Sequence, residues 1–426
     1  MNQVKLAIEG GTPIRDLKKK PFPSVPIIDD DDIFRVNEVL RRGKLTGLNG
    51  VMVKEFERQF LTYYGVKHAI ATSSGTTALH ATIEGLKIGP GDEVITTSIT
   101  FIATANAILH NNAIPVFADI DPKTYTISPE SIKEKITDRT KAILPVHIYG
   151  HPCDMDAIAE IAKDHNLFVI EDCAQAHGAE YRGNKVGTMG DAGCFSLWEN
   201  KNIGTGEGGV IITNDDKLNE RVRMIINHYR SLVSPWPEVP PWEVFLGIGY
   251  NYRITELQAA LAIGQIQKLD KFNSVRRKIA EFYISELKNV PGLNVPYVAP
   301  DVKHAWYQFV CTVRKDEIRV TTKEIVNAIN AEFGVYPESI FLFSVARRNI
   351  TPIYNQPVFA QRIGYAGKPC PFTCHGQNVK YEKGMCPNAE EFCENSFILF
   401  INHAMAIDDA KDVVEAVKKV FTAYAK

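Results

Sequence analysis

The stretch CFSLWENKNIGTGEGGVIIT, residues 194–213, joins two apolar runs through a lysine and a group of glycines. The lysine is Lys201, and the glycines are Gly204, Gly206, Gly208 and Gly209. Glycine lets the backbone pass tightly and leaves a neighbouring side chain room to move. A solvated lysine before a glycine-rich turn is a common feature without chemistry. A lysine that does covalent chemistry needs a desolvated site or a cationic neighbour, and the stretch by itself leaves both interpretations open.

On either side of this stretch, short apolar runs alternate with helical patterns from about residue 55 to 262. The runs typical of strands are 67–73, 93–98, 114–120, 141–148, 167–172, 192–197 and 208–213. Near-continuous apolar strands between helices indicate a mostly parallel sheet covered on both faces. We therefore predict an α/β fold whose large domain, residues 36–262, holds a mostly parallel, seven-stranded sheet covered by helices.

A second, smaller domain is predicted for residues 263–426, where strands and helices alternate less regularly. Residues 251–270 predict a long helix that leaves the large domain, because Thr255 and Gln258 have the spacing of a capping box. Further elements are expected over 304–313 (a strand), 321–334 (a helix) and 408–424 (the last helix). We expect an α+β arrangement there, with the proline-rich residues 1–35 packed along it as an N-terminal arm.

Composition and charge limit the partners of the chain. Its 426 residues are too many for one simple core. The formal net charge of −2 does not favour a nucleic-acid partner, which needs a basic surface. The N-terminal stretch lacks the apolar core of a signal peptide, and no apolar run is long enough for a membrane helix. We expect a cytoplasmic protein that binds neither nucleic acid nor a membrane.

Four of the eight cysteines fall within residues 370–393, and these are Cys370, Cys374, Cys386 and Cys393. With His375 they form the pattern C-x3-C-H…C-x6-C, which is not a standard zinc-binding spacing. Metal ligands, a disulfide and reduced cysteines in a packed loop all remain open here. We predict no metal site.

Polar and aromatic residues follow several predicted strands at their carboxyl ends, where open α/β sheets bind ligands. Asp172 ends the strand 167–172, although it could simply cap the next turn. Gly75, in ATSSGTTALH, precedes a helix whose free N–H groups would bind an anion, although Ser74 could be a plain helix cap. Phe101 would offer a flat surface to a planar ring, although most aromatic residues are core. Ser196 would add a hydroxyl donor to an anion.

One ligand uses all of these features together with Lys201, namely pyridoxal 5′-phosphate. Its phosphate suits a helix N-terminus and its ring suits the aromatic face of Phe101. Its protonated pyridine nitrogen suits the carboxylate of Asp172, and its aldehyde reacts with a lysine amine. The sequence therefore predicts a pyridoxal phosphate site.

The motifs SSGTTAL, TFIATANAI, IEDCAQAHGA, KNIGTGEGG and GYNYRITELQAA together resemble the DegT/StrS-type sugar aminotransferase family, within the fold-type I pyridoxal phosphate enzymes. The resemblance covers nearly the whole chain. It implies that Lys201 bonds covalently to the cofactor aldehyde and that Asp172 pairs with the ring nitrogen. The remaining implied roles are ring-hydroxyl contact for Gln175, ring stacking for Phe101, and phosphate binding for Gly75, Thr76 and Ser196.

The resemblance also implies a partner subunit. Asn251, in GYNYR, matches the residue that the family sends to the phosphate of the partner's cofactor. A homodimer with shared active sites follows from it. His228 lies where family members have His-Gly, but Tyr229 replaces the glycine here. A substrate-facing His228 and an interior structural His228 are both open.

The implied activity is transamination. Glutamate or glutamine would give its amino group, and a keto-sugar, typically nucleotide-linked, or a keto-cyclitol would receive it, yielding an amino sugar or an aminocyclitol. A related subset of the family has histidine at the lysine position and removes a hydroxyl instead, so Lys201 favours amino transfer. A non-catalytic sensor on the same fold is a second alternative, and Lys201 and Asp172 argue against it.

Overall fold

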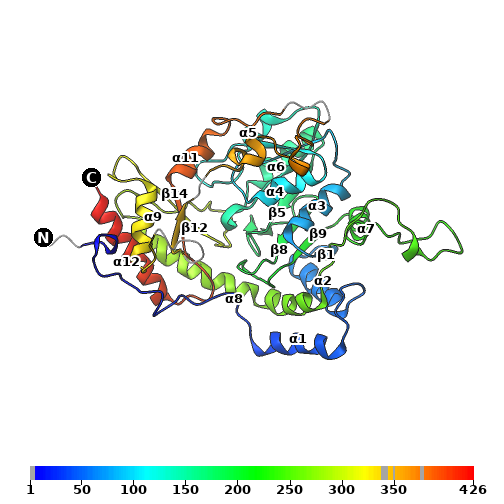
Figure 1. The fold of residues 1–426 in the computed structure, drawn as a ribbon, viewed down its shortest axis with the longest axis horizontal. Coiled ribbons are helices and arrows are strands. Elements are labelled where there is room, and N and C mark those ends of the chain that lie inside the picture. Colours follow the sequence, from blue (N-terminus) through cyan, green and yellow to red (C-terminus); the bar gives the residue numbers. More distant parts are fainter. Residues whose placement is uncertain (1–4, 337–343, 349–350, 375–378) are drawn as a thin grey trace.

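A computed structural model describes residues 5–336, 344–348, 351–374 and 379–426 of the chain. At its centre lies a seven-stranded sheet of strand order β1-β9-β8-β5-β4-β2-β3 (Figure 1). Its strands are β1 (His68–Thr72), β2 (Glu93–Thr97), β3 (Ile114–Ala118), β4 (Thr140–Leu144), β5 (Phe168–Asp172), β8 (Ala192–Ser196) and β9 (Gly209–Thr213). Only β9 runs antiparallel to its neighbours β1 and β8. The predicted mostly parallel, seven-stranded sheet is confirmed.

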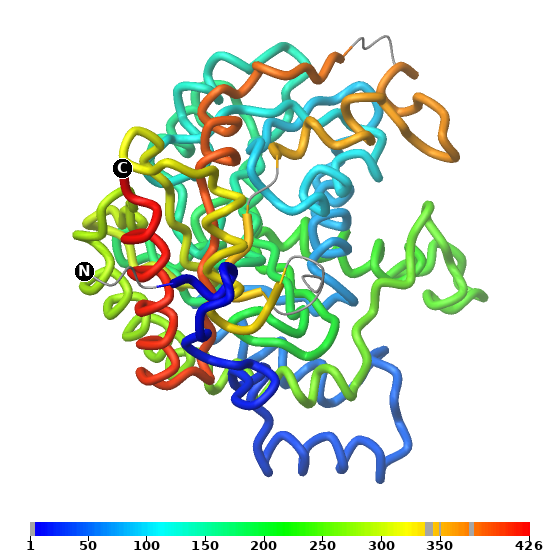
Figure 2. The backbone as a smooth tube through the Cα atoms, turned by 60° about the vertical axis from the view of Figure 1, so that its left-hand side comes forward, coloured from blue at the N-terminus to red at the C-terminus, as the bar shows by residue number. Residues whose placement is uncertain are grey.

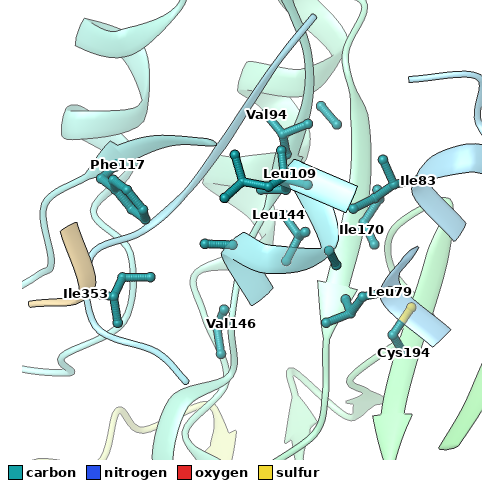
Figure 3. Close-up of a cluster of buried hydrophobic side chains, with 14 of the residues drawn as sticks. Leu79, Ile83, Val94, Leu109, Phe117, Leu144, Val146, Ile170, Cys194 and Ile353 are labelled. Carbon is teal, nitrogen blue, oxygen red and sulfur yellow. The ribbon is translucent and has the colours of Figure 1, made fainter. Parts of the chain in front are cut away.

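Helices cover both faces of this sheet. Successive strand residues point to opposite faces, and residues on each face are buried. Val94 and Ile211 join the apolar cluster on one face (Figure 3). Ile95 and Ile212 join the clusters on the other face. The helices of the first face are α3 (Gly75–Gly85), α4 (Ile102–His110) and α7 (Asp216–Ile225), and those of the second are α2 (Val51–Tyr64), α5 (Pro129–Lys135), α6 (Met155–His165) and the first half of α8 (Glu256–Leu287).

Two predicted elements have different bounds in the structure. The helix expected over 251–270 is α8, which begins with the predicted capping box of Thr255 and Gln258 and continues to Leu287. The strand expected over 304–313 is shorter, since β12 comprises Phe309–Val313 only. Trp306 has a φ of 50°, which a strand does not allow. Residues 304–308 therefore form a bent segment, which carries Tyr307 toward Lys201.

The C-terminal part contains a four-stranded antiparallel sheet of order β10-β12-β14-β13, which packs on helices. These elements are β10 (Leu293–Asn294), β13 (Ala346–Arg348), β14 (Ser396–Leu399), α9 (Thr322–Ala331) and α12 (Ile407–Tyr424). Leu6 is buried in the same cluster, and Arg15 Nη1 lies 2.6 Å from Asp409 Oδ1. In Figure 2 the blue N-terminal segment accordingly runs beside the red α12. The division into residues 1–35, 36–262 and 263–426 stays a prediction.

A segment near the C-terminus returns to the large sheet. Its elements are η5 (Ile353–Asn355), α10 (Pro357–Ala360), η6 (Tyr365–Gly367) and α11 (Pro387–Asn395). Phe359, Phe372 and Tyr381 of this segment are buried, and the Phe359 and Phe117 rings lie 5.2 Å apart at their centroids. Figure 3 shows Ile353 beside Phe117 of β3. The segment therefore forms part of the wall around the carboxyl edge of the sheet.

The cysteines of this segment behave in two ways. Cys370 and Cys374 form a disulfide, whereas Cys386 and Cys393 are buried thiols. His375 lies outside the described residues. Among the four cysteines the structure thus assigns one disulfide and two packed thiols.

The periphery holds three further features. A small sheet consists of β11 (Val302–Lys303), β6 (Glu180–Tyr181) and β7 (Asn184–Lys185), and α1 (Asp30–Arg42) packs along α8. The loop after α7 projects from the body in Figure 1 and Figure 2. Within the described ranges, no helix combines the length and the apolar character that crossing a membrane requires.

Candidate active site

Lys201 lies in the tight turn between β8 and β9. Its N–H donates to Trp198 O at 2.9 Å, and a Cβ added at Gly204 would lie 2.4 Å from Glu199 O. Only glycine fits position 204 without displacing the backbone. The Lys201 Nζ lies 4.5 Å from the centroid of the Tyr307 ring. The glycine-rich stretch thus folds the turn back on itself, and an aromatic ring from the C-terminal part lies under the lysine.

Asp172 lies at the carboxyl end of β5 and is only 4% exposed. Its Oδ1 accepts a hydrogen bond from the N–H of Ala174 at 3.0 Å, and its Oδ2 accepts one from Thr104 Oγ1 at 2.8 Å. Burial raises the pKa of Asp172, while these two hydrogen bonds and then the Lys201 charge act in the opposite direction. A buried carboxylate of this kind gains from a cation placed beside it.

The start of α3 lies where the sequence predicts an anion-binding cradle. Ser74 caps the helix by accepting from Thr77 N at 3.1 Å, and Gly75 and Thr76 begin its first turn. A Cβ at Gly75 would lie 2.8 Å from Ser196 Cβ. The helix N-terminus and Ser196, at the end of β8, are therefore in contact only because position 75 has no side chain. Free N–H groups at a helix N-terminus favour a phosphate.

Phe101 and Gln175 line one cavity of about 590 Å³. Phe101 precedes the first turn of α4 and is 69% exposed, so its ring face is available to a ligand. Gln175 Oε1 accepts from Tyr149 N at 2.8 Å, in the turn η2 (Ile148–Gly150), which holds the side-chain amide in place. Thr104, one turn after Phe101, joins α4 to Asp172.

Asn251 precedes Tyr252, whose O accepts a hydrogen bond from Ser73 N at 2.8 Å, just before α3. Asn251 and His228 lie on the surface. Both are exposed, and the neighbouring Asn227 pairs with Asn251 in an isolated β-bridge. The interpretation of His228 as an interior structural residue is therefore wrong. His228 has a φ of 61° and its N–H donates to Tyr250 O, so it serves the turn that positions residues 249–253. The role of Asn251 toward a partner stays a prediction.

Two residues near the site carry no signal in the sequence. Thr104 and Tyr307 are separated from Asp172 and Lys201 by 68 and 106 positions, and only the fold brings them together. Threonine and tyrosine are common residues without a motif of their own here. Nothing in the spacing could have selected them.

A buried His147–Glu171 pair beside Asp172 has the residue types of a metal site. Its hydrogen bonds show a different role. His147 Nδ1 accepts from Cys153 N at 3.0 Å, so the proton is on Nε2, which donates to Glu171 Oε2 at 3.0 Å. The remaining acceptor positions of Glu171 take backbone N–H groups from Gly187, Met189 and Gly190. The pair therefore holds the 187–190 turn against β5.

Comparisons with known proteins agree with this geometry. Residues 26–418 match the family model described as the DegT/DnrJ/EryC1/StrS aminotransferase family. GDP-perosamine synthase of Caulobacter vibrioides is 42% identical over 293 residues, which cover 68% of this chain and 76% of that protein. A putative L-glutamine:3-amino-2,3-dideoxy-scyllo-inosose aminotransferase of Streptoalloteichus tenebrarius is 40% identical over 427 residues, covering 98% of this chain and 97% of the relative.

The fold gives the same answer. The X-ray structure of the aminotransferase from Psychrobacter cryohalolentis matches with a TM-score of 0.82 and 31% identity, covering 94% of this chain and 99% of that one. The mixed, mostly parallel sheet with its smaller antiparallel sheets is that of fold-type I aminotransferases. The chain belongs to the DegT/DnrJ/EryC1/StrS aminotransferase family, a family of pyridoxal phosphate-dependent enzymes that act on sugars and aminocyclitols.

Proposed function

We propose that this chain transfers an amino group from glutamate or glutamine to a keto-sugar or a keto-cyclitol, with pyridoxal phosphate as its cofactor. The observation that carries the proposal is the buried Asp172 carboxylate at the end of β5, within electrostatic reach of Lys201. Lys201 itself is half-buried, and its charge counteracts the rise in the pKa of Asp172 that burial causes. The relatives named above include a GDP-perosamine synthase and a putative aminotransferase of an amino-inosose, so their names cover both a sugar and a cyclitol.

The residues fit pyridoxal phosphate. Burial disfavours the charge of Asp172, so the carboxylate suits a protonated ring nitrogen beside it. The space between Gly75, Thr76 and Ser196 is open because Gly75 has no Cβ, which would collide with Ser196. This cradle offers backbone N–H groups and a hydroxyl to a phosphate. When bound, the cofactor supplies an electron-withdrawing ring that stabilises negative charge at the reacting carbon.

Each side chain has a defined task in this proposal. As a general base, the Lys201 amine would take the proton from the α-carbon of the amino donor. As a general acid, it would then deliver that proton to the cofactor carbon that carries the aldehyde. Asp172 holds the proton on the ring nitrogen, and Thr104 keeps the carboxylate oriented. Phe101 covers the ring and excludes water from it, and the Gln175 amide orients the ring hydroxyl.

A homodimer with shared active sites is part of the proposal. The exposed position of Asn251 suits a residue that reaches a partner. The neighbouring loop, residues 232–248, exposes apolar side chains, and these are Leu232, Val233, Trp236, Trp242, Phe245, Leu246 and Ile248. Apolar groups concentrated on one projecting loop are typical of an interaction surface. A cytoplasmic location stays a prediction of the sequence.

The test measures the visible absorbance of bound pyridoxal phosphate. We expect the protein loaded with this cofactor to lose that absorbance (to bleach) with L-glutamate or L-glutamine and to regain it when a keto-sugar or an inosose is added. Lys201→Ala should fold normally and should not bleach. Lys185→Ala is the matched control, because Lys185 Nζ also lies over a tyrosine ring, 4.7 Å from the centroid of Tyr63. Bleaching of Lys201→Ala at the wild-type rate would contradict the proposal.

The two alternatives give other results in the same experiment. A sensor would be coloured and would not bleach with any donor. A dehydratase would yield a deoxygenated sugar that keeps its keto group and gains no amine, with the amino group of the donor released as ammonia. Bleaching by the donor, together with one new amino group in each product molecule, separates the aminotransferase from both alternatives.

A further inference from the structure

The cavity lined by Phe101 and Gln175 has a charged wall opposite them. Arg347 and Arg348, on the edge strand β13, both line it. None of the described residues that line the cavity is acidic. Two guanidinium groups without a carboxylate give the cavity a positive potential, and its low-dielectric walls strengthen that potential.

Within the described part of the chain, both arginines are free of ion pairs. Neither forms an ion pair with a carboxylate of the described residues, and the Nε of Arg348 is buried without a hydrogen-bond partner. Arg348 contributes to the lowered pKa of Glu394, but the hydrogen bond and the charge of Lys315 lower that pKa more. Lys315 Nζ lies 2.9 Å from Glu394 Oε1, so that carboxylate already has its own cation.

The backbone that carries the arginines is firmly held. Ala346, just before them, exchanges two hydrogen bonds with the side chain of Asn330, Nδ2 to O at 2.8 Å and N to Oδ1 at 2.9 Å. Arg347 and Arg348 pair with Ile398 and Phe397 of β14. Positive groups on a pinned strand are pre-organised, which is what recognition of a fixed anionic group requires.

We propose that Arg347 and Arg348 determine acceptor specificity by binding a phosphate group of the acceptor, so that the acceptor is a phosphorylated or nucleotide-linked sugar and not an uncharged cyclitol. This inference rests on the proposed function. Guanidinium groups match phosphate oxygens in geometry and charge. Gln308 and Gln356, which also line the cavity, add neutral donors for sugar hydroxyls.

Glutamine carries one carboxylate and glutamate carries two, and the α-carboxylate that both donors share fits the wall less well. The α-carboxylate is bonded to the carbon that must react beside Lys201. Lys201 is not among the residues that line the cavity of the arginines. A phosphate lies several bonds away from a sugar carbonyl, so it can reach the wall while the carbonyl lies near Lys201.

The experiment measures binding to the holoenzyme by calorimetry, with glucose 1-phosphate and uridine diphosphate as anionic probes and glucose and uridine as their neutral counterparts. We expect Arg347→Gln and Arg348→Gln each to weaken the anionic probes roughly tenfold or more and to leave uridine unchanged. Lys418→Gln, which removes one positive charge on α12, should bind all four probes as the wild type does. Wild-type binding of the anionic probes should also weaken with added salt.

A second arm separates acceptor from donor. The rate of bleaching by L-glutamate and L-glutamine in a single turnover should be nearly equal in the wild type and both arginine variants. A slower donor reaction with unchanged phosphate binding would assign the arginines to the donor carboxylate and overturn the proposal. Anionic probes that bind no better than neutral ones, or efficient turnover of uncharged scyllo-inosose, would overturn it as well. Phosphate binding without bleaching by any donor would instead refute the proposed function and leave the anion site standing.

Discussion

At the scale of single residues, the site depends on how Asp172 is held. Its carboxylate is buried, and Thr104 and Ala174 satisfy its oxygens, yet the net effect of the environment is a raised pKa. The ionised Asp172 carboxylate is therefore more stable with a cationic ligand beside it than in an empty pocket. Ionised Asp172 lowers the stability of the folded protein when no cofactor is bound.

Asp172→Asn tests this balance. We expect the donor reaction to slow about 100-fold or more, since a neutral amide cannot hold a proton on the ring nitrogen, while the phosphate contacts keep the cofactor bound. Because the folded pKa of Asp172 is raised, the ionised group disfavours the folded state at high pH. The cofactor-free variant should therefore have a higher Tm than the wild type at pH 8, and this gain should vanish at low pH, where Asp172 is protonated. A lower Tm at pH 8 would contradict the assignment.

At the scale of elements, α3 carries a half-buried acid, Glu84, at the end far from the site. Burial raises the pKa of Glu84 to about 7, and the His80 Nε2 lies 4.0 Å from Glu84 Oε2. Burial also lowers the pKa of His80 to about 4. Both groups therefore favour their neutral forms, in the helix that packs against the stacked rings of Tyr250 and Tyr252.

Glu84→Gln should change how stability depends on pH. A raised folded pKa gives stability that is present below about pH 4.5 and is lost as the pH rises toward 7. The difference in the free energy of unfolding between Glu84→Gln and the wild type should therefore grow in favour of the variant over this range. His80 titrates in both proteins, so its opposite slope cancels in the difference. Urea unfolding at several pH values measures it, and a constant difference would refute the buried-acid interpretation.

The C-terminal segment that returns to the large sheet is held by aromatic packing. Phe359 is fully buried, and its ring contacts those of Phe117 and Tyr381 edge-on. Phe359→Ala should cost about 3–5 kcal/mol of stability, because a large cavity replaces the ring. Proteolysis within residues 361–385 should become faster, whereas Phe168→Ala, at an exposed position, should change neither quantity much.

At the scale of the whole molecule, the prediction concerns two copies of the chain. If Asn251 of one copy completes the site that contains Lys201 of the other, two inactive variants should complement each other. Mixing Lys201→Ala with Asn251→Ala under exchanging conditions should restore roughly a quarter of wild-type activity, because random pairing makes half the dimers mixed and each has one intact site.

Two controls accompany the mixing experiment. Ile248→Asp should give a species of the single-chain mass of 47.6 kDa in sedimentation, because it places a charge in the apolar loop at Ile248, which is 81% exposed. The Ile248→Asp form of either variant should not complement. Activity in the mixture no greater than the sum of the separate variants would contradict shared sites.

Local pattern was sufficient for much of this fold. Apolar runs between helical patterns identified all seven strands of the main sheet, and the capping box of Thr255 and Gln258 placed the start of α8. These features depend on residues close in the chain, where hydrogen bonding and side-chain alternation operate. The glycine-rich turn around Lys201 belongs to the same class, because its backbone geometry needs residues without side chains at fixed positions.

Sequence by itself determined the order of the elements, the family and the residue types that a phosphate-bearing aldehyde cofactor needs. Only the tertiary structure decided which distant residues meet them. Thr104 at Asp172, Tyr307 under Lys201 and the Arg347–Arg348 wall each come from a different part of the chain. Such contacts arise from the packing of whole elements around a shared core, and no periodicity along the chain records which side chains that packing will place together.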